Sequence, residues 1–333
     1  MREALFYKKV EGEKVKCVLC PRNCLIADRK FGFCRARKNI GGELYSMVYG
    51  RPASVHVDPV EKKPLFHFLP GSTALSFGTT GCNFSCDNCQ NFEISQSYPE
   101  ESPDVEEVSP ERIVELSLRY GCRSIAYTYN EPTVFYEYML DTARIAKKRG
   151  IKNIMVSNGF INPLPLKKIL PYLDAANIDL KGNEEFYRRV SKGELEPVLK
   201  AIKTIRKAGV WLELTNLLIP GFNDSEMNIE WLSSWIEDNL GREVPLHISR
   251  FFPMFRMSNV KITPESSIEK AYSIARKHLD FVYTGNLFSG REDTLCPSCG
   301  KVLVRRSGYF IEYNNIRGGK CSFCGRIVPG VWE

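Results

Sequence analysis

Apolar and polar positions alternate along the middle of the chain in a pattern that predicts a parallel α/β fold. Runs rich in β-branched and aromatic residues alternate with amphipathic stretches of roughly 10–15 residues. We expect strands over 73–80, 124–130, 153–159, 175–182, 210–221, 245–251 and 281–286. We expect helices over 109–120, 132–149, 163–172, 184–190, 196–208, 224–240 and 264–278.

Strands that alternate with helices are typical of βαβ units, which build parallel sheets. The number of units favours a partial or full (β/α) TIM-type barrel, in which chemistry occurs at the C-terminal ends of the strands. An open doubly wound sheet is the alternative, because periodicity alone does not show closure. Local signals support the helix bounds. Ser109-Pro110-Glu111 offers an N-cap, an N1 proline and an early acid, and Gly150 is a helix stop.

Composition changes this picture mainly through cysteine. The chain has 333 residues, of which 12 are cysteines, and a net charge of +7 that is spread over mixed runs. Such runs are usually solvated helix faces and only weakly suggest a polyanionic partner. No apolar run approaches the roughly 20 residues of a membrane span, and the first residues show no signal-peptide pattern. We therefore expect a cytoplasmic protein with reduced thiols, whose cysteines bind metals.

Three cysteines follow the first predicted strand of the alternating region. Cys82, Cys86 and Cys89 lie in the run GTTGCNFSCDNCQNF with C-x3-C-x2-C spacing. This spacing places three thiolates around three irons of a [4Fe–4S] cube and leaves one iron open for chemistry. The alternative is a zinc knuckle that lacks one ligand, which His67 would complete.

Two further groups each contain four cysteines. The first, with C-x2-C-x3-C-x9-C spacing, predicts a closed site for structural zinc or an auxiliary [4Fe–4S] cluster; buried free cysteines are the alternative. The second consists of two C-x2-C-G knuckles and predicts a zinc-ribbon-like site, which iron would also fit. Cys122 stands alone and is expected to be a small buried hydrophobe. The two groups are Cys17, Cys20, Cys24 and Cys34, and Cys296, Cys299, Cys321 and Cys324.

The central spacing resembles the signature of radical S-adenosylmethionine (SAM) enzymes. In that superfamily the open iron chelates the amino and carboxylate groups of SAM, and one electron cleaves SAM to a 5′-deoxyadenosyl radical. The segment YNEP at 129–132 resembles the Gly-Gly-Glu-Pro element of those enzymes, although the glycines are absent. The resemblance implies that Glu131 holds the SAM amino group through a charge-assisted hydrogen bond.

Later segments resemble pyruvate formate-lyase activating enzymes. Ser157-Asn158-Gly159, Asp179-Leu180-Lys181, the turn at 219–224 and the strand at 245–257 that contains His247 match their elements. The blocks CVLCPRNCLI, GFCRAR, CQNFEIS and YNEPT together resemble the AmmeMemoRadiSam-system radical SAM family, which is similar to those activating enzymes. Cofactor-binding roles for Asn158, Asp179, Lys181 and His247 are implied by this resemblance.

Each of these residues also has an ordinary structural interpretation. Glu131 suits a helix start, Asn158-Gly159 is a common turn pair, and Asp179 with Lys181 suits a solvated ion pair. A histidine in an apolar strand, as at His247, is usually part of the core. The pattern also departs from the family at Asn88, where an aromatic residue usually packs near the adenine. Phe84 or Phe92 would then take that role.

Together these features predict a radical SAM enzyme in three parts: a four-cysteine module at 1–70, a barrel core at 71–290 and a zinc-ribbon-like module at 291–333. The resemblance implies a [4Fe–4S] cluster, SAM, a low-potential donor such as ferredoxin or flavodoxin, and a protein or small-molecule substrate. A glycyl-radical-type protein is the substrate that the activating-enzyme likeness suggests, but likeness of fold does not establish a function. An RNA-modifying radical SAM enzyme and a non-catalytic iron–sulfur or zinc scaffold are the alternatives.

Overall fold

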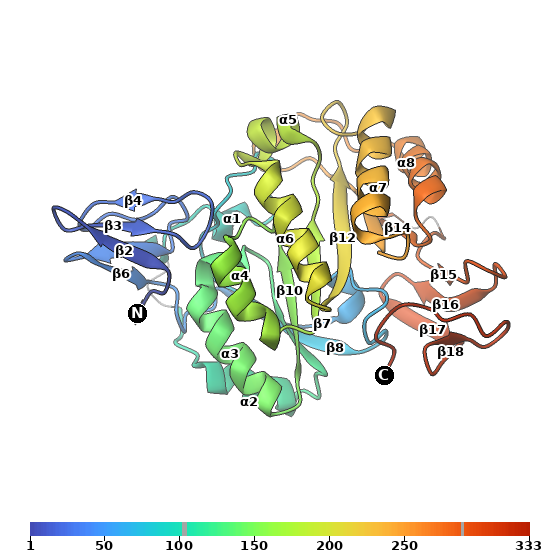
Figure 1. The fold of residues 1–333 in the computed structure, drawn as a ribbon, viewed down its shortest axis with the longest axis horizontal. Coiled ribbons are helices and arrows are strands. Elements are labelled where there is room, and N and C mark those ends of the chain that lie inside the picture. The colour runs from blue at the N-terminus through green and yellow to red at the C-terminus, as the bar shows by residue number, and fades with distance from the viewer. Residues whose placement is uncertain (102–104, 288–289) are drawn as a thin grey trace. The chain divides into compact units, whose positions relative to one another are not determined.

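The computed structural model describes residues 1–101, 105–287 and 290–333. Its central element is an eight-stranded sheet in the order β14-β13-β12-β11-β10-β9-β8-β7. Figure 1 labels β7, β8, β10, β12 and β14 of this sheet. The pairs β8–β9, β9–β10, β12–β13 and β13–β14 are all parallel. The expected α/β fold with a largely parallel sheet is therefore confirmed. None of the described helices combines the length and the apolarity that a membrane crossing requires.

The expected strands and helices occur with small shifts at their ends. The strands of the sheet are β7 Ser54–Pro59, β8 Thr73–Gly78, β9 Ser124–Tyr127, β10 Lys152–Ser157, β11 Ala175–Asp179, β12 Trp211–Leu218, β13 Leu246–Arg250 and β14 Val282–Gly285. The helices between them are α1 Phe92–Ser95, α2 Pro110–Arg119, α3 Tyr136–Lys148, α4 Pro163–Ile169, α5 Glu184–Phe186, α6 Leu195–Lys207, α7 Glu226–Leu240 and α8 Glu265–His278.

The local signals that predicted these helices act as expected. The Ser109 hydroxyl accepts a hydrogen bond from the backbone N–H of Arg112 at 3.2 Å and caps α2. Ser225 caps α7 in the same way through Asn228 N, at 3.3 Å. Gly150 follows α3 with a φ of 73°, a conformation in which glycine is favoured.

Three expected helices are only partly α-helical, and the one expected over 163–172 ends in a 3-10 turn, Leu170–Tyr172. The other two are those expected over 132–149 and 184–190. The first starts with a 3-10 turn, Pro132–Phe135, because the Glu131 side chain accepts from Thr133 N and tightens the entry. The second stops being α-helical after α5. There the carbonyl oxygens of Val190 and Ser191 accept hydrogen bonds from Asp87 N and Ser85 N, so they are engaged by the cysteine loop.

Small antiparallel sheets that the sequence analysis did not assign occupy both ends of the chain. The N-terminal strands form the orders β1-β6-β5 and β2-β3-β4, and the C-terminal strands form β15-β16-β17 and β18-β19. Their bounds are β1 Arg2–Glu3, β2 Tyr7–Val10, β3 Lys14–Cys17, β4 Leu25–Ile26, β5 Arg37–Ile40, β6 Glu43–Ser46, β15 Thr294–Leu295, β16 Val302–Ser307, β17 Phe310–Asn314, β18 Ile316–Arg317 and β19 Lys320–Cys321.

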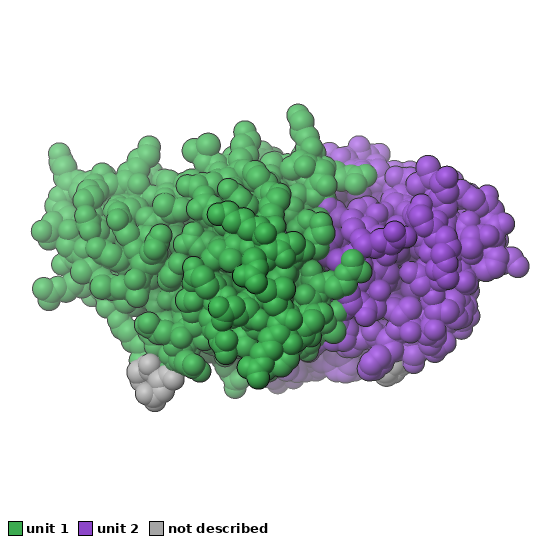
Figure 2. All heavy atoms as spheres, turned by 90° about the horizontal axis from the view of Figure 1, so that it is seen from below, with its two compact units in different colours: residues 1–58, 73–176, 190–210 green, residues 59–72, 177–189, 211–333 purple. Residues whose placement is uncertain are grey.

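The chain divides into two compact units, which Figure 2 shows in different colours. Unit 1 comprises 1–58, 73–176 and 190–210, and unit 2 comprises 59–72, 177–189 and 211–333. In unit 1, α2 packs against β8 and β9, and α3 packs against β9 and β10. In unit 2, α7 packs against α8, which covers β13 and β14. The three-part division expected from the sequence stays a prediction.

The core of unit 2 contains a network of buried polar groups. Glu213 on β12 is fully buried and accepts from His247 Nε2 at 2.7 Å and from His67 N at 2.8 Å. The ring nitrogens of His67 contact Pro329 O at 2.7 Å and the Tyr283 hydroxyl at 2.6 Å. Burial lowers the pKa of His67 to about 4, although the nearby charge of Glu213 opposes this shift.

We predict that unit 2 loses stability on acidification because of His67. Between pH 6.5 and about 4 the unfolded chain binds a proton that the folded His67 does not, so stability falls as pH falls. The slope contributed by one proton is at most about 1.4 kcal/mol per pH unit. Trp211 and Trp332 lie against the His67 ring, so denaturant unfolding followed by tryptophan fluorescence reports on this region.

The variant His67→Phe should be less stable at pH 7, because two hydrogen bonds are lost, but its stability should depend less on pH between 6.5 and 5. An unchanged slope in this variant would contradict the assignment to His67. The exposed His56→Phe exchange is the matched control and should leave the slope as it is.

Candidate functional site

The predicted cluster cysteines lie in a loop of unit 1 that directly follows β8. The Sγ atom of Cys82 accepts from Phe84 N at 3.4 Å, and the Sγ atom of Cys89 lies 3.0 Å from the hydroxyl of Ser95 on α1. The Cys86 Sγ atom lies 4.0 Å from Ser191 O. The loop therefore has one contact within its own backbone, one to α1 and one to the segment at Ser191.

The surroundings of Cys82 favour the protonated thiol over the thiolate when no metal is bound. Burial raises the pKa of Cys82, and the nearby charges of Glu131, Cys86 and Cys89 raise it further. Without a cation this thiol stays protonated at neutral pH. Iron would replace the proton and compensate the buried charge, which couples metal binding to proton release.

The aromatic residues near the loop differ in their surroundings. Phe84 is fully buried and packs on Phe160 with a centroid distance of 4.8 Å. A Cβ atom at Gly193 would lie 2.2 Å from the Phe84 ring, which shows how tightly this side chain is packed. Phe92 is half-buried at the start of α1. Of the two, Phe92 keeps more exposed surface for a ligand.

Asn88 directly precedes Cys89, the third cysteine of the loop. It is buried, and its Oδ1 atom has no hydrogen-bond partner within the described ranges. A buried acceptor without a partner costs about 1–3 kcal/mol. The Asn88 carbonyl therefore offers an acceptor to a ligand with an N–H group, and the adenine of SAM carries one.

Glu131, which follows β9, organises the neighbouring strand ends. Its Oε1 atom accepts from Thr133 N, Thr133 Oγ1 and Ser157 Oγ at 3.0, 2.6 and 2.8 Å. Its Oε2 atom accepts from Asn158 N at 2.8 Å. The side chain is buried, and burial raises the pKa of Glu131, whereas these hydrogen bonds lower it. The carboxylate therefore connects the end of β10 to the 3-10 turn Pro132–Phe135, which directly follows Glu131 in the chain.

Asn158 connects this carboxylate to the cysteine loop. Its Nδ2 atom lies 3.9 Å from Cys82 Sγ and 2.9 Å from Asn83 Oδ1, and its Oδ1 atom accepts from Phe160 N at 2.8 Å. Hydrogen bonds to ligating sulfurs tune the potential of an iron–sulfur cluster. Cys82 was predicted from its spacing, and Glu131 and Asn158 from the family resemblance; all three lie close together in unit 1.

The other predicted cofactor residues belong to unit 2. Lys181 Nζ pairs with Asp179 Oδ2 at 2.7 Å, which matches the ion pair that the sequence left as an alternative. His247 is buried and bonds to Glu213. Cofactor contacts by these three residues stay predictions. His67 already uses both ring nitrogens within unit 2, so it is poorly suited to complete a zinc knuckle with Cys82.

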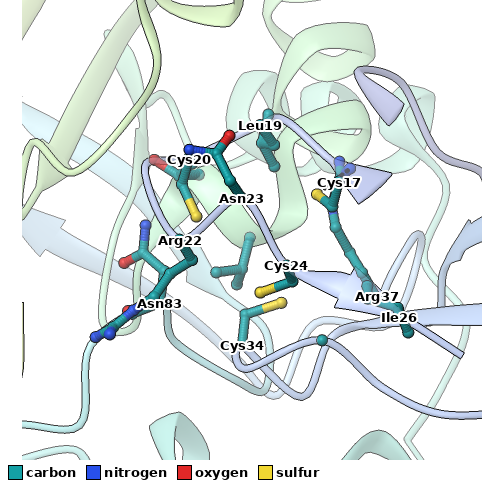
Figure 3. A pocket seen from close by; sticks show the side chains of 13 residues that line it. Cys17, Leu19, Cys20, Arg22, Asn23, Cys24, Ile26, Cys34, Arg37 and Asn83 are labelled. Carbon is teal, nitrogen blue, oxygen red and sulfur yellow. Dashed lines mark hydrogen bonds between the residues drawn. The ribbon is translucent and has the colours of Figure 1, made fainter. Parts of the chain in front are cut away.

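The four N-terminal cysteines line one cavity in unit 1, and their sulfurs turn toward the same space (Figure 3). Burial raises the pKa of Cys34 to about 11 and also raises that of Cys20 and Cys24. Arg37 is buried in an ion pair with Glu137, and its Nη1 atom lies 4.0 Å from Cys17 Sγ. The cavity is therefore suited to an anionic thiolate–metal group.

The four C-terminal cysteines have the spacing of a single-ion site. Their sulfurs all lie within 4.8 Å of one another, with 3.6 Å between Cys296 and Cys324 and 3.8 Å between Cys299 and Cys321. Four thiolates on one zinc at 2.3 Å form a tetrahedron with edges of about 3.8 Å. Burial would raise the pKa of Cys321, but hydrogen bonds from the backbone of Phe323 and Cys324 lower it to about 7. The structure thus contains a group that could hold a metal.

Sequence reasoning missed several residues that shape the central site. Asn83 bonds to Asn158 and donates to Phe160 O at 2.7 Å, and Ser95 contacts the third cysteine. Gly81 has a φ of 88° beside Cys82. Asn83 and Gly81 lie next to a predicted ligand, and this adjacency was the available signal. Ser95 ends the CQNFEIS block that resembles the family, but its contact with Cys89 depends on how α1 turns back onto the loop.

Comparison with known proteins agrees with this geometry. The radical SAM superfamily profile matches residues 77–230, which contain the cysteine loop, Glu131 and Asn158. An uncharacterized protein of Methanocaldococcus jannaschii is 46% identical over 335 residues, covering 99% of this chain and 100% of the relative. Residues 77–230 of this chain therefore form a radical SAM superfamily domain. Cys82, Cys86 and Cys89 are its candidate ligands for the [4Fe–4S] cluster that the superfamily implies, together with SAM.

Two further proteins are similar to part of this chain or to its fold. The (2S)-3-sulfopropanediol dehydratase activating enzyme of Klebsiella oxytoca is 24% identical over 151 residues, covering 41% of this chain and 47% of that enzyme. A radical SAM methyltransferase from Sphaerobacter thermophilus has a similar fold, with a TM-score of 0.52 and 15% identity over 65% of this chain and 67% of that one.

We predict that replacing Glu131 by Gln destabilises unit 1. The Gln amide nitrogen cannot accept the hydrogen bonds that one carboxylate oxygen now accepts, and an unsatisfied buried donor costs about 1–3 kcal/mol. Denaturant unfolding of the metal-free protein measures the loss. Glu196→Gln, on the exposed face of α6, is the control and should be close to neutral. Equal stability of both variants would contradict an anchoring role for Glu131.

We predict that the C-terminal cysteines bind one zinc ion. Zinc analysis of Cys321→Ser should show the loss of one equivalent, because a hydroxyl does not replace a thiolate ligand at this site. The neighbouring exposed Ser322→Ala serves as the matched control and should retain the metal. Full zinc content in Cys321→Ser would rule out this residue as a ligand.

Proposed function

We propose that this radical SAM enzyme cleaves SAM reductively at the loop of Cys82, Cys86 and Cys89 and uses the product radical to abstract hydrogen from a substrate. The observation that carries the proposal is the contact of the Asn158 amide with the Cys82 sulfur within unit 1. The Glu131 carboxylate holds Asn158 in place by accepting a hydrogen bond from its backbone N–H. The three cysteines would hold three irons and leave the fourth for SAM. The bound cluster and SAM would supply the radical chemistry, while the protein supplies position and exclusion of water.

The residues of the chain would contribute in distinct ways. Glu131 fixes the backbone of Asn158 through its N–H, and the Asn158 amide in turn contacts the Cys82 sulfur. Since both carboxylate oxygens already accept hydrogen bonds, we propose that Glu131 acts first as a positioning residue. The Asn88 Oδ1 acceptor, which has no hydrogen-bond partner among the described residues, would receive an N–H of the adenine.

For the substrate we propose a glycyl-radical-type protein. The proposal is supported by the sequence likeness to the dehydratase activating enzyme of Klebsiella oxytoca and by the activating-enzyme motifs of the sequence. In this role the chain would transfer the radical site to a backbone glycine of its partner and release 5′-deoxyadenosine. The electron would come from a low-potential donor of the ferredoxin or flavodoxin class.

A second candidate, an RNA-modifying enzyme, is favoured by the surface of the C-terminal module. Phe310 and Phe323 are more than half exposed, and Tyr309 and Tyr313 are also exposed. Lys301 lies over the Phe323 ring and Arg305 over the Tyr313 ring. Aromatic rings beside cations are suited to stacking single-stranded nucleic acid. RNA binding that weakens steeply with salt would support this candidate, and absence of binding at low salt would remove it.

We predict that anaerobically reconstituted, reduced protein forms 5′-deoxyadenosine from SAM, and that Cys86→Ala abolishes this product. Loss of one ligand removes an iron that the cube needs. Product is quantified by chromatography after a fixed time. Cys122→Ala, which changes a buried cysteine outside the three groups, is the control and should retain activity. Product formation by Cys86→Ala at the wild-type level would refute the catalytic assignment and leave the scaffold alternative.

A further inference from the structure

The two cysteine groups of unit 1 lie against each other at Cys82, and both of its sequence neighbours make the contact. On one side, a Cβ atom at Gly81 would lie only 2.2 Å from the carbonyl oxygen of Cys34. On the other side, the Asn83 carbonyl accepts from Arg22 Nε at 3.0 Å, and Asn83 itself lines the N-terminal cavity. Cys82 is therefore the predicted cluster ligand that lies next to the N-terminal site.

Arg22 occupies the position between the two groups. It lies in the chain between Cys20 and Cys24, and its guanidinium interacts electrostatically with both of them and with Cys82. The guanidinium is placed over the Phe33 ring at 3.8 Å and is fixed further by hydrogen bonds to the carbonyls of Asn83 and Lys192. A cation held in this way would stabilise negative charge in both sites at once.

The spacing of the sulfurs separates the N-terminal site from the C-terminal one. The C-terminal four lie within 4.8 Å of one another, as a single ion requires. Within the described ranges, the N-terminal sulfurs do not form such a group, although all four cysteines face one cavity (Figure 3). Thiolates at the corners of a four-iron cube are farther apart than thiolates on one zinc ion.

The surroundings of the cavity also suit a cluster. Besides the cysteines it is lined by the apolar side chains of Leu19, Ile26 and Val134 and by polar side chains that include Arg22 and Asn83. The buried Arg37 lies beside Cys17 and supplies positive charge. Low solvent exposure and hydrogen bonds to the sulfurs are two ways in which a protein adjusts the potential of an iron–sulfur cluster.

We propose that Cys17, Cys20, Cys24 and Cys34 hold an auxiliary [4Fe–4S] cluster that exchanges one electron with the cluster held by Cys82, Cys86 and Cys89. The connection from one site to the other runs through the chain from Cys82 to Asn83, across the hydrogen bond to Arg22, and along the chain to Cys20. This electron exchange rests on the proposed function of the central site, whereas the presence of the auxiliary cluster does not.

The electron balance is simple. A low-potential, one-electron iron–sulfur or flavin protein would reduce the auxiliary core from the 2+ to the 1+ state. The auxiliary core returns to 2+ when the electron passes to the central cluster. No bond of the polypeptide forms or breaks in this exchange, and no proton leaves the chain.

The first test uses the full chain with Cys82, Cys86 and Cys89 all replaced by Ala, reconstituted anaerobically with iron and sulfide. We expect about four irons and four sulfides per chain to remain, and an electron paramagnetic resonance (EPR) signal of one reduced cube after dithionite. Cys20→Ser added to this variant should remove the signal. Zinc in place of iron, or no iron at all, would overturn the proposal. Neither readout depends on SAM cleavage, so a failure of the proposed function is distinguishable.

The second test addresses the contact between the sites. In the wild-type chain with both clusters reduced, the EPR spectrum should show spin–spin broadening that is absent when only one site is filled. Arg22→Gln should retain the iron but shift both midpoint potentials to more negative values, because reduction then lacks a nearby positive charge. Arg29→Gln, at an exposed arginine, is the control and should shift neither. Two magnetically independent clusters, or a shift of only one potential in Arg22→Gln, would contradict the connection.

Discussion

The tight placement of Cys82 is the constraint on which the rest of the site depends. Three contacts fix the chain around this residue. The Cys34 carbonyl lies close to Gly81, and the Arg22 side chain donates to the Asn83 carbonyl. The Asn158 amide lies next to the Cys82 sulfur. The approach of the Cys34 carbonyl requires a glycine at position 81, since any Cβ atom would collide with the backbone. A ligand fixed in this way would give the proposed metal site one orientation, and the thiols of Cys86 and Cys89 would then complete the site.

This arrangement also explains why a carboxylate lies close to a site of thiolates, where its charge alone would be unfavourable. Burial and the neighbouring thiols make negative charge costly here, and burial raises the pKa of both Glu131 and Cys82. The hydrogen bonds that Glu131 accepts offset part of that cost and set the conformation of 157–158. The same carboxylate therefore holds the ends of two strands and sets the electrostatics beside the Cys82 thiol.

Much of the central fold could be predicted from the sequence, since strand–helix periodicity, the Ser109 and Ser225 caps and Gly150 are local signals. The same holds for the cysteine groups, whose spacing carries the chemistry. The short antiparallel strands at both ends could not be predicted in this way, because pieces such as Arg2–Glu3 and Leu25–Ile26 have no periodicity of their own. The roles of Arg22 and Ser95 were also inaccessible. Arg22 bonds to residues 61 and 170 positions away, and only the folded chain brings them together.

The central claim is that three cysteines hold a cube with one iron left for SAM, and the most direct test is EPR of the reduced protein with SAM labelled with nitrogen-15 at its amino group. To remove the second iron site, Cys17, Cys20, Cys24 and Cys34 would be replaced by Ala. The account predicts that SAM changes the cluster spectrum and that the labelled nitrogen shows hyperfine coupling to it. A spectrum that stays the same when SAM is added, with no coupling to the label, would contradict the claim.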